Sequence, residues 1–428
     1  MASRTLIAYA NGRRVGTLID ENGIWSFGYD PDWVAAKDAF PLSPAFPLNS
    51  VRVVDGSSER PVQWFFDNLL PEEAMRDALA KEASMDASDA WGLLAYYGRE
   101  TAGALSLMAE GEIEPKGDRV PLPLNELEKR IQAMPTLALS ATSPKRMSAA
   151  GAQQKLLVIL TGKHPKHELF EPVGAEPSMH LLKPDMRTTG YPHSAINEFF
   201  CARLARQLGL NVPHTHFLRA PSACYVIDRF DRDTASTPAS RVHMLDATQL
   251  LNKDKAFKYN NANAKALAEC VALLSTKALA RLALFRWTVF NILIGNADAH
   301  LKNVSFFSRA SGFALAPFYD LVSTVVYNTP SYNEHSEPWP HVELSMPIGN
   351  ARRFDEVSRA NVLAFAEELG IRASGAKKDL EKTLAELPGA IERAREEVNI
   401  IAEPSAGEIR LLDGITHMPL NEMSRALS

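Results

Sequence analysis

Paired cysteines are missing from this sequence. Its three cysteines, Cys201, Cys224 and Cys270, are scattered, and none forms part of a CxxC pair or accompanies a histidine cluster. This spacing argues against both a disulfide framework and a cysteine-ligated zinc site. It indicates three buried thiols in a reducing compartment.

Long uninterrupted apolar runs are absent as well. The most apolar stretch, residues 279–295, contains two arginines and an asparagine and is short for a bilayer. We interpret it as a buried helix. Residues 1–12 lack the apolar core of a signal peptide. We therefore expect a cytoplasmic protein that does not enter a membrane.

The chain has no excess of positive charge. Its formal net charge is −5 and its pI is about 6.2, so it carries no overall positive field for nucleic acid. Hydrophobic residues make up 46% and charged residues 23%, which is typical of a globular protein. A length of 428 residues predicts two or three lobes.

Predicted strands dominate the first half of the chain and predicted helices the second. Strand patterns occur at residues 6–9, 14–19, 25–29, 156–160, 180–183 and 225–227. Helical patterns occur at residues 31–33, 197–208, 264–275, 276–294, 355–369 and 377–400. The pair Asn11-Gly12 predicts a tight hairpin turn between the first two strands.

This order predicts an α+β chain in three parts. Residues 109–123 have the Gly-, Pro- and charge-rich composition of a linker. We therefore place an N-terminal α+β module at residues 1–108, a strand-rich lobe at 124–231 and a largely helical lobe at 232–428. A strand-rich lobe followed by a helical lobe is the order of a two-lobed kinase.

Polar residues gather directly after the predicted helix 276–294. Asp298 and Asn303 are five positions apart, and Asp320 follows between apolar segments. Phosphoryl transfer needs a carboxylate that orients the acceptor hydroxyl and oxygen ligands for Mg²⁺. An Asp followed five residues later by an Asn is the catalytic-loop spacing of protein kinases. The alternative is that Asp298 and Asn303 only cap a helix or stabilise a turn.

Two weaker elements precede this cluster. A run of small residues from Ser148 to Lys155 leads into the strand 156–160, and small residues let backbone N–H groups approach phosphate. The run contains one glycine, so it matches neither a Walker A motif nor GxGxxG. Lys183 ends a strand, and Glu198 on the next helix could pair with it. An ordinary tight loop and a solvated lysine are the alternatives.

Together these segments resemble the HipA family, the kinase toxins of type II toxin–antitoxin pairs. The segments that carry the resemblance are Ser148–Lys155, Leu182–Pro184, Asp228–Asp231, Asn291–Asn303 and Tyr319–Asp320, with Asn68–Pro71 and Gly98–Ala104 in the N-terminal module. They occur in family order and span nearly the whole chain. The resemblance implies a protein-kinase-like fold and a serine/threonine protein kinase that uses ATP and Mg²⁺.

The resemblance also implies a role for individual residues. Asp298 is the expected catalytic base, Asn303 and Asp320 are the expected Mg²⁺ ligands, and Ser148 is the expected autophosphorylated serine. The expected ATP-binding residues are Ala149, Ala150, Gly151, Ala152, Gln153, Gln154, Lys155, Lys183, Asp228, Phe230, His300 and Lys302. Gln154 departs from the family, whose members often have Glu or Pro at this position.

Phosphorylation of Ser148 has a physical rationale as an off-switch. A phosphoserine adds roughly −1.5 to −2 charge at neutral pH, and beside ATP it would repel the nucleotide's phosphates. The alternative is that Ser148 is a turn hydroxyl without a regulatory role.

The resemblance further implies partners. These are a small helix-turn-helix antitoxin of the HipB type, operator DNA reached mainly through that antitoxin, and a protein substrate such as an aminoacyl-tRNA synthetase, notably glutamyl-tRNA synthetase. A basic cluster is formed by Arg372, Lys377, Lys378 and Lys382. It could face DNA phosphates, or it could be a solvated helix face.

Two other functions stay open. Asp298-Ala299-His300 with Asn303 also resembles the catalytic loop of phosphoinositide kinases, which would indicate a small-molecule or lipid kinase. The protein could also be a pseudokinase that binds an antitoxin as a co-repressor. The presence of Asp298, Asn303 and Asp320 together favours an active kinase, because a binding module needs none of them.

Overall fold

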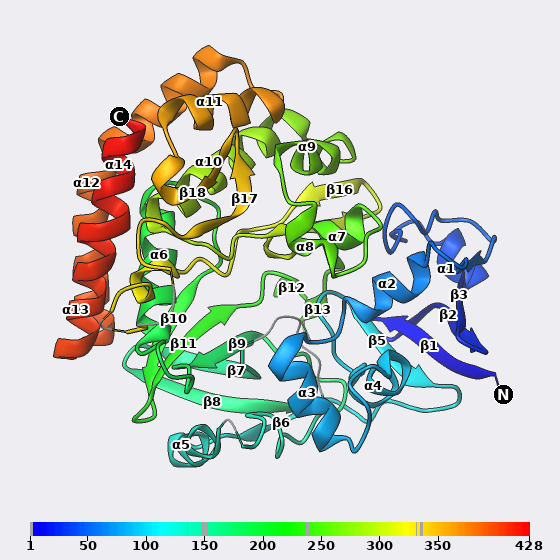
Figure 1. Ribbon diagram of the computed structural model, residues 1–428. Helices are drawn as coiled ribbons and strands as arrows, with labels where there is room; N and C mark the ends of the chain where they lie inside the picture. The colour runs from blue at the N-terminus through cyan, green and yellow to red at the C-terminus, as the bar shows by residue number, and fades with distance from the viewer. Residues whose placement is uncertain (1–2, 135, 147–152, 237–238, 331, 334–336) are drawn as a thin grey trace. The chain divides into compact units, whose positions relative to one another are not determined.

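The structure is a computed structural model that describes residues 3–134, 136–146, 153–236, 239–330, 332–333 and 337–428. The chain forms two compact units (Figure 1). The first unit comprises Met1–Lys183, Asp228–Lys255 and Phe306–Ala316; the second comprises Pro184–Ile227, Ala256–Ser305 and Pro317–Ser428. The chain passes several times from one unit to the other. The three-part division expected from the sequence stays a prediction.

The first unit begins with an antiparallel sheet. Its strands are β1 (Arg4–Ala10), β2 (Arg13–Glu21), β3 (Ile24–Tyr29), β4 (Val53–Val54) and β5 (Leu105–Ala109), in the order β4-β3-β2-β1-β5. Asn11 and Gly12 have φ values of +49° and +76°. Two successive left-handed residues make the tight turn that suits a hairpin, so the predicted turn is confirmed.

The helices of the N-terminal module are α1 (Pro31–Ala35), α2 (Pro61–Asp67), α3 (Glu73–Glu82) and α4 (Ala90–Tyr97) (Figure 1). Helix α1 packs on β2, α2 on β3 and α4 on β5. Trp25 and Phe27 are buried, as their alternation in β3 predicts. The ring of Phe27 lies 5.7 Å from that of Phe46 and 5.6 Å from that of Phe66. These aromatic contacts form the core of the N-terminal module.

A second group of strands in the first unit carries the predicted phosphate-binding residues. It contains β6 (Asp118–Pro121), β7 (Leu156–Lys163), β8 (Lys166–Val173) and β9 (His180–Pro184), in the order β9-β7-β8-β6, with helix α5 (Leu124–Ala133). The remaining elements are β12 (Arg232–Asp233), β13 (Ser240–Arg241), β14 (Met244–Asp246), α7 (Ala247–Leu250), β15 (Ser305–Arg309) and β16 (Gly312–Leu315). The strands predicted at residues 156–160 and 180–183 are confirmed.

The interpretation of residues 109–123 as a linker is wrong for residues 118–121. These residues form β6, which pairs with β8 from Asp118 opposite Val173 to Pro121 opposite Phe170. All four side chains of β6 are exposed, and the strand pairs through its backbone alone. An exposed strand needs no apolar alternation, so its composition looks like that of a linker.

A buried ionic cluster centres on Glu100 in the first unit. The Glu100 carboxylate is fully buried and accepts hydrogen bonds from the backbone N–H of Ser178 at 2.9 Å and from Nη2 of Arg232 at 3.0 Å. Nζ of Lys145 lies 2.9 Å away and Nη1 of Arg229 lies 3.2 Å away. One carboxylate therefore joins four segments that are far apart in the sequence.

Charge explains why this cluster is stable. Burial by itself raises the pKa of Glu100, but the cations of Lys145, Arg241 and Arg232 outweigh it and hold that pKa well below the ordinary value. Asp231 supplies a second anion, which accepts the backbone N–H of Gly103 at 2.7 Å and pairs with the neighbouring arginines. The cations are thus buried together with their counter-charges.

We predict that Glu100→Gln lowers the free energy of unfolding by about 3–5 kcal/mol, because it removes the carboxylate that four buried cations share. Glu112→Gln is the matched control. Glu112 also pairs with an arginine, Arg99, but its side chain is 35% exposed, so the loss should stay below about 1 kcal/mol. Urea denaturation of the two variants measures both values. Equal losses would contradict the central role of Glu100.

His243 is a buried histidine in the same unit. Its side chain donates to the carbonyl of Leu42, with Nε2 3.0 Å from the oxygen, and its ring stacks on Phe40 at 4.8 Å. Burial lowers the pKa of His243 from 6.5 to about 4, and the bond to Leu42 opposes this only in part. The folded protein therefore holds His243 neutral at neutral pH.

The lowered pKa of His243 predicts that the stability of the protein depends on pH. Between about pH 6.5 and 4 the unfolded chain binds a proton at His243 and the folded chain does not, so stability falls as the pH drops through this window. The loss attributable to His243 should approach about 3 kcal/mol. Unfolding free energies measured at pH 7 and 5 should differ less in His243→Gln than in the wild type. The same change at exposed His164 should leave the pH dependence as it is.

The second unit is mainly helical. Its helices are α6 (Ser194–Gln207), α8 (Phe257–Asn260), α9 (Ala264–Ala272), α10 (Lys277–Ile294), α11 (Arg359–Glu368), α12 (Ala373–Ala402), α13 (Ala406–Ile415), the π-helix η4 (Thr416–Leu420) and α14 (Asn421–Leu427). Short 3₁₀ segments are η1 (Leu301–Asn303), η2 (Val325–Tyr327) and η3 (Phe354–Glu356), and the strands are β10 (Thr215–Arg219), β11 (Ala223–Asp228), β17 (Glu343–Ile348) and β18 (Ala351–Arg353). Among the helices of the described residues, none has the length and apolarity that crossing a membrane requires.

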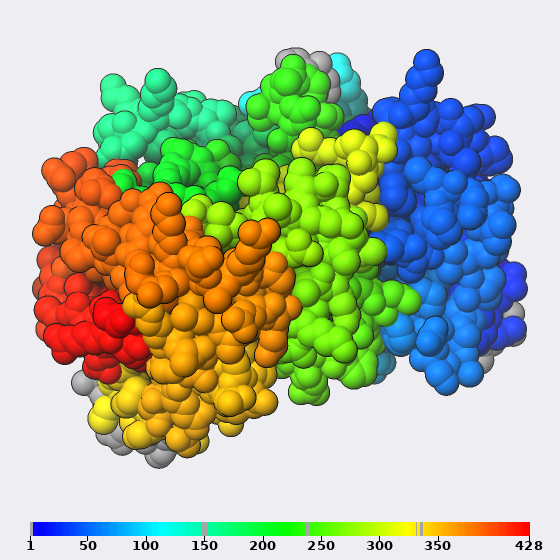
Figure 2. Space-filling model, turned by 90° about the horizontal axis from the view of Figure 1, so that it is seen from above, coloured from blue at the N-terminus to red at the C-terminus, as the bar shows by residue number. Residues whose placement is uncertain are grey.

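Helix α10 lies in the core of this unit. Its second half is buried without interruption from Trp287 to Ile294, as the apolar run predicts. Its first turn is different, because Leu279 is 72% exposed. The long helix α12 packs along α6 and contacts α11, and the C-terminal residues form one continuous part of the surface (orange to red in Figure 2).

Most predicted helices are confirmed with shifted ends. The helix predicted at residues 355–369 begins at Arg359, because Ser358 and Asn361 form a capping box that starts it there. Gly370, with φ of +86°, follows its end as predicted. Gly209, with φ of +76°, plays the same role after α6.

Candidate active site

Gly295 ends helix α10 and turns the chain sharply. It adopts a left-handed conformation with φ of +64°. A Cβ atom at this position would collide with Cγ2 of Val325 and lie 2.9 Å from Cβ of Pro419. Only glycine fits this turn, and it starts the loop that carries Asp298 and Asn303.

Asn296 ties this loop to the segment that contains Asp320. Its Oδ1 accepts the backbone N–H of Asp298 at 3.0 Å. Its Nδ2 donates to Oδ1 of Asn291 at 2.8 Å and to the backbone carbonyl of Asp320 at 3.4 Å. One buried amide therefore fixes the backbone of both predicted functional aspartates.

Asn303 closes the loop from the other side. Its Nδ2 donates to the backbone carbonyl of Asp298 at 2.7 Å, and the backbone N–H of His300 donates to the same carbonyl at 2.9 Å. With the nitrogen of Asn303 engaged in this way, Oδ1 is the atom of its amide that can bind a cation. An amide oxygen and the carboxylate of Asp320 are the hard ligands that Mg²⁺ prefers. The donor set therefore fits a magnesium ion.

Asp320 has an unusual backbone conformation. Its φ is +57°, in the left-handed region that Asp and Asn tolerate better than most residues. The flanking residues hold it there. The hydroxyl of Tyr319 donates to the carbonyl of Lys302 at 2.8 Å, and the N–H of Phe318 donates to the carbonyl of Asn211 at 2.8 Å.

Electrostatics distinguishes Asp298 from an ordinary surface carboxylate. Its side chain is 51% exposed. Partial burial raises its pKa, and the negative charge of Asp320 raises it further, while His300 and the hydroxyl of Tyr259 lower it. Burial also raises the pKa of Tyr225, and the negative charges of Glu198 and Asp320 raise it further. Asp298 and Asp320 thus influence each other, as groups of one site do.

In the second unit the structure therefore brings together five predicted residues. They are Asp298, His300, Lys302, Asn303 and Asp320. His300, Lys302 and Asn303 are buried, and Nε2 of His300 lies 3.8 Å from Oδ1 of Asp298. The hydrogen bonds through Asn296 and Asn303 also stabilise the turn, so the chemical roles of Asp298 and Asn303 stay predictions.

The predicted lysines of the first unit lie on neighbouring strands. Leu156 pairs with Leu182 in the antiparallel ladder, so Lys155 and Lys183 are at the same end of β7 and β9. Both are buried, with 7% and 6% exposure. A solvated surface lysine is therefore the wrong description for either residue, and buried lysines are rare without a partner. Glu198 belongs to the second unit, so its pairing with Lys183 stays a prediction.

The remaining predicted residues of the first unit have separate contacts. Asp228 lies 3.4 Å from Nε2 of His180, and Phe230 packs edge-on against Phe307 at 5.9 Å. Oε1 of Gln154 accepts the backbone N–H of Leu139 at 3.1 Å, so this side chain anchors the chain just before β7. Gln153 is half-buried. Ser148, Ala149, Ala150, Gly151 and Ala152 lie outside the described residues.

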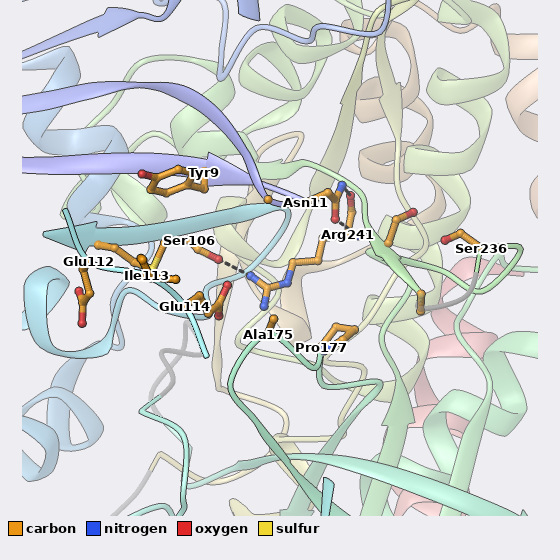
Figure 3. Close-up of a pocket in the computed structure, with 14 residues that line it drawn as sticks. Tyr9, Asn11, Ser106, Glu112, Ile113, Glu114, Ala175, Pro177, Ser236 and Arg241 are labelled. Carbon is orange, nitrogen blue, oxygen red and sulfur yellow. Dashed lines mark hydrogen bonds between the residues drawn. The ribbon is translucent and has the colours of Figure 1, made fainter. Parts of the chain in front are cut away.

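The first unit also contains a cavity of about 680 Å³ (Figure 3). Arg241 extends into it, donates to Oγ of Ser106 and lies 3.6 Å from the buried Glu100. Its lining combines acidic, apolar and small polar side chains, among them Glu114, Ile113 and Tyr9. Among the described residues, the lining includes none of the predicted site residues.

Two residues of the candidate site were not singled out from the sequence. Asn296 stands inside the motif from Asn291 to Asn303, and its position between Gly295 and Asp298 is the signal that could have found it. Tyr259, whose hydroxyl donates to Oδ1 of Asp298 at 2.5 Å, is 39 positions upstream of it. No motif includes Tyr259, so the sequence gives no signal for this contact.

Comparison with known proteins establishes the family. The model of the HipA-like C-terminal domain matches residues 147–394, and the model of the HipA N-terminal domain matches residues 6–108. The chain belongs to the HipA family. The resemblance inferred from the motifs is confirmed, and so is the kinase enzyme class that it implied.

Individual HipA relatives agree with this. The serine/threonine-protein kinase toxin HipA of Shewanella oneidensis is 31% identical over 85% of this chain and 82% of the relative. The Sinorhizobium fredii protein Y4mE is 30% identical over 96% of this chain and 99% of the relative. A solved structure of Shewanella oneidensis HipA with HipB and operator DNA gives a TM-score of 0.81 at 25% identity, covering 99% of this chain and 97% of that chain. The α+β, kinase-like fold is thereby confirmed.

Proposed function

We propose that this HipA-family kinase is the toxin of a toxin–antitoxin pair, that it uses ATP and Mg²⁺, and that it phosphorylates a serine or threonine of a translation component. An aminoacyl-tRNA synthetase, such as glutamyl-tRNA synthetase, is the substrate we expect. Loss of tRNA charging would then arrest growth. The observation that carries the proposal is the loop in which Asn303 and Asn296 fix Asp298 beside Asp320.

Each of the predicted site residues named here has a distinct chemical role in the proposal. Asp298 orients the acceptor hydroxyl and takes up its proton as the hydroxyl oxygen bonds to the γ-phosphorus and the bond to ADP breaks. Asn303 and Asp320 hold Mg²⁺, which offsets the negative charge of the nucleotide's phosphates. Lys155 and Lys183 contact those phosphates, and Asp228 and Phe230 contact the adenine side of the nucleotide.

Partners are proposed from the relative of known structure. Shewanella oneidensis HipA is seen in a complex with HipB and operator DNA, and it matches 99% of this chain. We expect a HipB-like helix-turn-helix antitoxin for this protein, with operator DNA contacted mainly through the antitoxin. The net charge of −5 supports an indirect role in DNA binding, because the chain has no overall positive field.

Self-inactivation through Ser148 is the regulatory part of the proposal. The segment that contains Ser148 is anchored before it by Lys145, which pairs with the buried Glu100, and after it by Gln154, which binds the backbone of Leu139. Ser148 is part of the small-residue run that we expect to cover the ATP phosphates, so we expect a phosphate on it to lie near them. Its charge would oppose nucleotide binding there.

We predict that Asp298→Asn reduces transfer from labelled ATP to the protein substrate about a hundredfold or more, because an amide cannot accept the hydroxyl proton. Antitoxin binding should be unchanged, and toxicity on expression should be lost. Thermal denaturation checks that the variant folds. Label that appears only on a small metabolite would favour a small-molecule or lipid kinase. Unchanged toxicity of Asp298→Asn would favour a pseudokinase co-repressor.

We predict that Ser148→Ala removes self-inactivation and keeps ATP binding. After incubation with ATP, the wild type should lose most of its activity and carry one phosphate by mass spectrometry, whereas the variant should carry none and stay active. Ser143→Ala is the control, because Ser143 lies outside the small-residue run and its hydroxyl bonds to Glu171 at 2.6 Å. Failure of Ser148→Ala to bind ATP would instead make Ser148 a structural part of the pocket.

A further inference from the structure

A short helix lies over the loop that carries Asp298. Helix α8 (Phe257–Asn260) contacts both η1 and β17 within the second unit. The hydroxyl of Tyr259 donates to Oδ1 of Asp298 at 2.5 Å, and its ring meets that of His300 edge-on at 4.9 Å. Tyr259 therefore touches both the proposed base and the residue beside it.

The contact has a specific chemical meaning. A general base must lie within hydrogen-bond distance of the hydroxyl whose proton it removes. The hydroxyl of Tyr259 occupies such a position on Asp298, since it donates to a carboxylate oxygen at hydrogen-bond distance. A serine or threonine of a substrate cannot donate to Oδ1 of Asp298 along the same line while Tyr259 is bound there.

Exposure distinguishes Tyr259 from a residue of the core. Its side chain is 41% exposed, and neighbouring Phe257 is 42% exposed. None of the four residues of α8 is buried. Segments with little buried surface open at a low cost in free energy, so displacement of Tyr259 from Asp298 requires no opening of the buried core.

We propose that Tyr259 occupies the acceptor-hydroxyl subsite of this kinase and that the hydroxyl of a substrate serine or threonine replaces it on Asp298. The inference rests on the proposed role of Asp298 as the base. Tyr259 then sets the affinity for the acceptor, because a bound substrate must compete with an intramolecular hydroxyl. It also keeps water from this one position on Oδ1 of Asp298 while no acceptor is present.

The proposal predicts different effects of Tyr259 on the two substrates of the reaction, ATP and the acceptor. ATP does not compete with Tyr259, whereas the acceptor does. Removal of the phenolic hydroxyl should therefore lower the KM for the acceptor and leave the KM for ATP unchanged. A purely structural role for Tyr259 would affect both constants together, through loss of folded protein or distortion of the loop.

The test compares Tyr259→Phe, Tyr259→Ala and Phe257→Leu with the wild type, using the full chain, labelled ATP and dephosphorylated casein as the acceptor probe. In Tyr259→Phe we expect the KM for casein to fall about tenfold, as loss of a hydrogen bond to a charged group implies. The KM for ATP should change less than about twofold. Phe257→Leu alters the neighbouring exposed aromatic residue, which carries no hydroxyl, and should leave both constants unchanged.

Hydrolysis of ATP without casein provides a second readout. It should rise in Tyr259→Phe and rise further in Tyr259→Ala, because water can then take the place of the phenolic hydroxyl on Oδ1 of Asp298. A lower kcat/KM for casein in Tyr259→Phe, or no change in any constant, would overturn the proposal. Asp298→Asn tells the two failures apart: if that variant keeps its activity, the assignment of the base is wrong, and if it is inactive, only the role of Tyr259 fails.

Discussion

The side-chain amide of Asn296 is the interaction on which the candidate site depends. It binds the backbone of Asp298 with its oxygen and the backbone of Asp320 with its nitrogen. The two carboxylates repel each other, since the charge of Asp320 adds to burial in raising the pKa of Asp298, so a fixed backbone is needed to hold them in one site. Gly295 makes this possible, since its left-handed turn lets the chain leave α10 and bury Asn296 at once. The protein's own amide thus fixes the backbone of both aspartates, and fixed polar groups are what a preorganised site requires.

Charged groups are also held close together in the first unit, around the buried Glu100. There the cations outnumber the anions, and burial is tolerated because each charge has a partner of opposite sign. The cluster joins the N-terminal module to the segment before Ser148 and to residues 229–232. The two lysines at the ends of β7 and β9 lie in the same unit, so the proposed phosphate-binding residues rest on a frame that this cluster stabilises.

Part of the fold and of the candidate site could be predicted from the sequence. The reasons why some features were predicted and others were missed are physical. The hairpin at Asn11-Gly12 and the helix ending at Gly295 follow from local rules, because left-handed positions demand particular residues. The spacing of Asp298 and Asn303 is equally visible in the sequence, because five positions lie within one loop. Asp320 follows between apolar segments. Strand β6 was missed because all its side chains are exposed. Burial of Lys155 and Lys183, and the contact from Tyr259 to Asp298, depend on tertiary packing that no local pattern encodes.

The contacts of Glu100 have a consequence for how the two family-matched segments of this protein can evolve. The N-terminal match ends at residue 108 and the C-terminal match begins at 147, as if the two segments could be exchanged independently. Yet Glu100, in the first segment, neutralises Arg229 and Arg232, in the second. A gene rearrangement that replaced the first segment would have to supply a carboxylate at the same place, or leave Asp231 as the counter-charge for both guanidinium groups. The buried charges therefore constrain the two segments to change together.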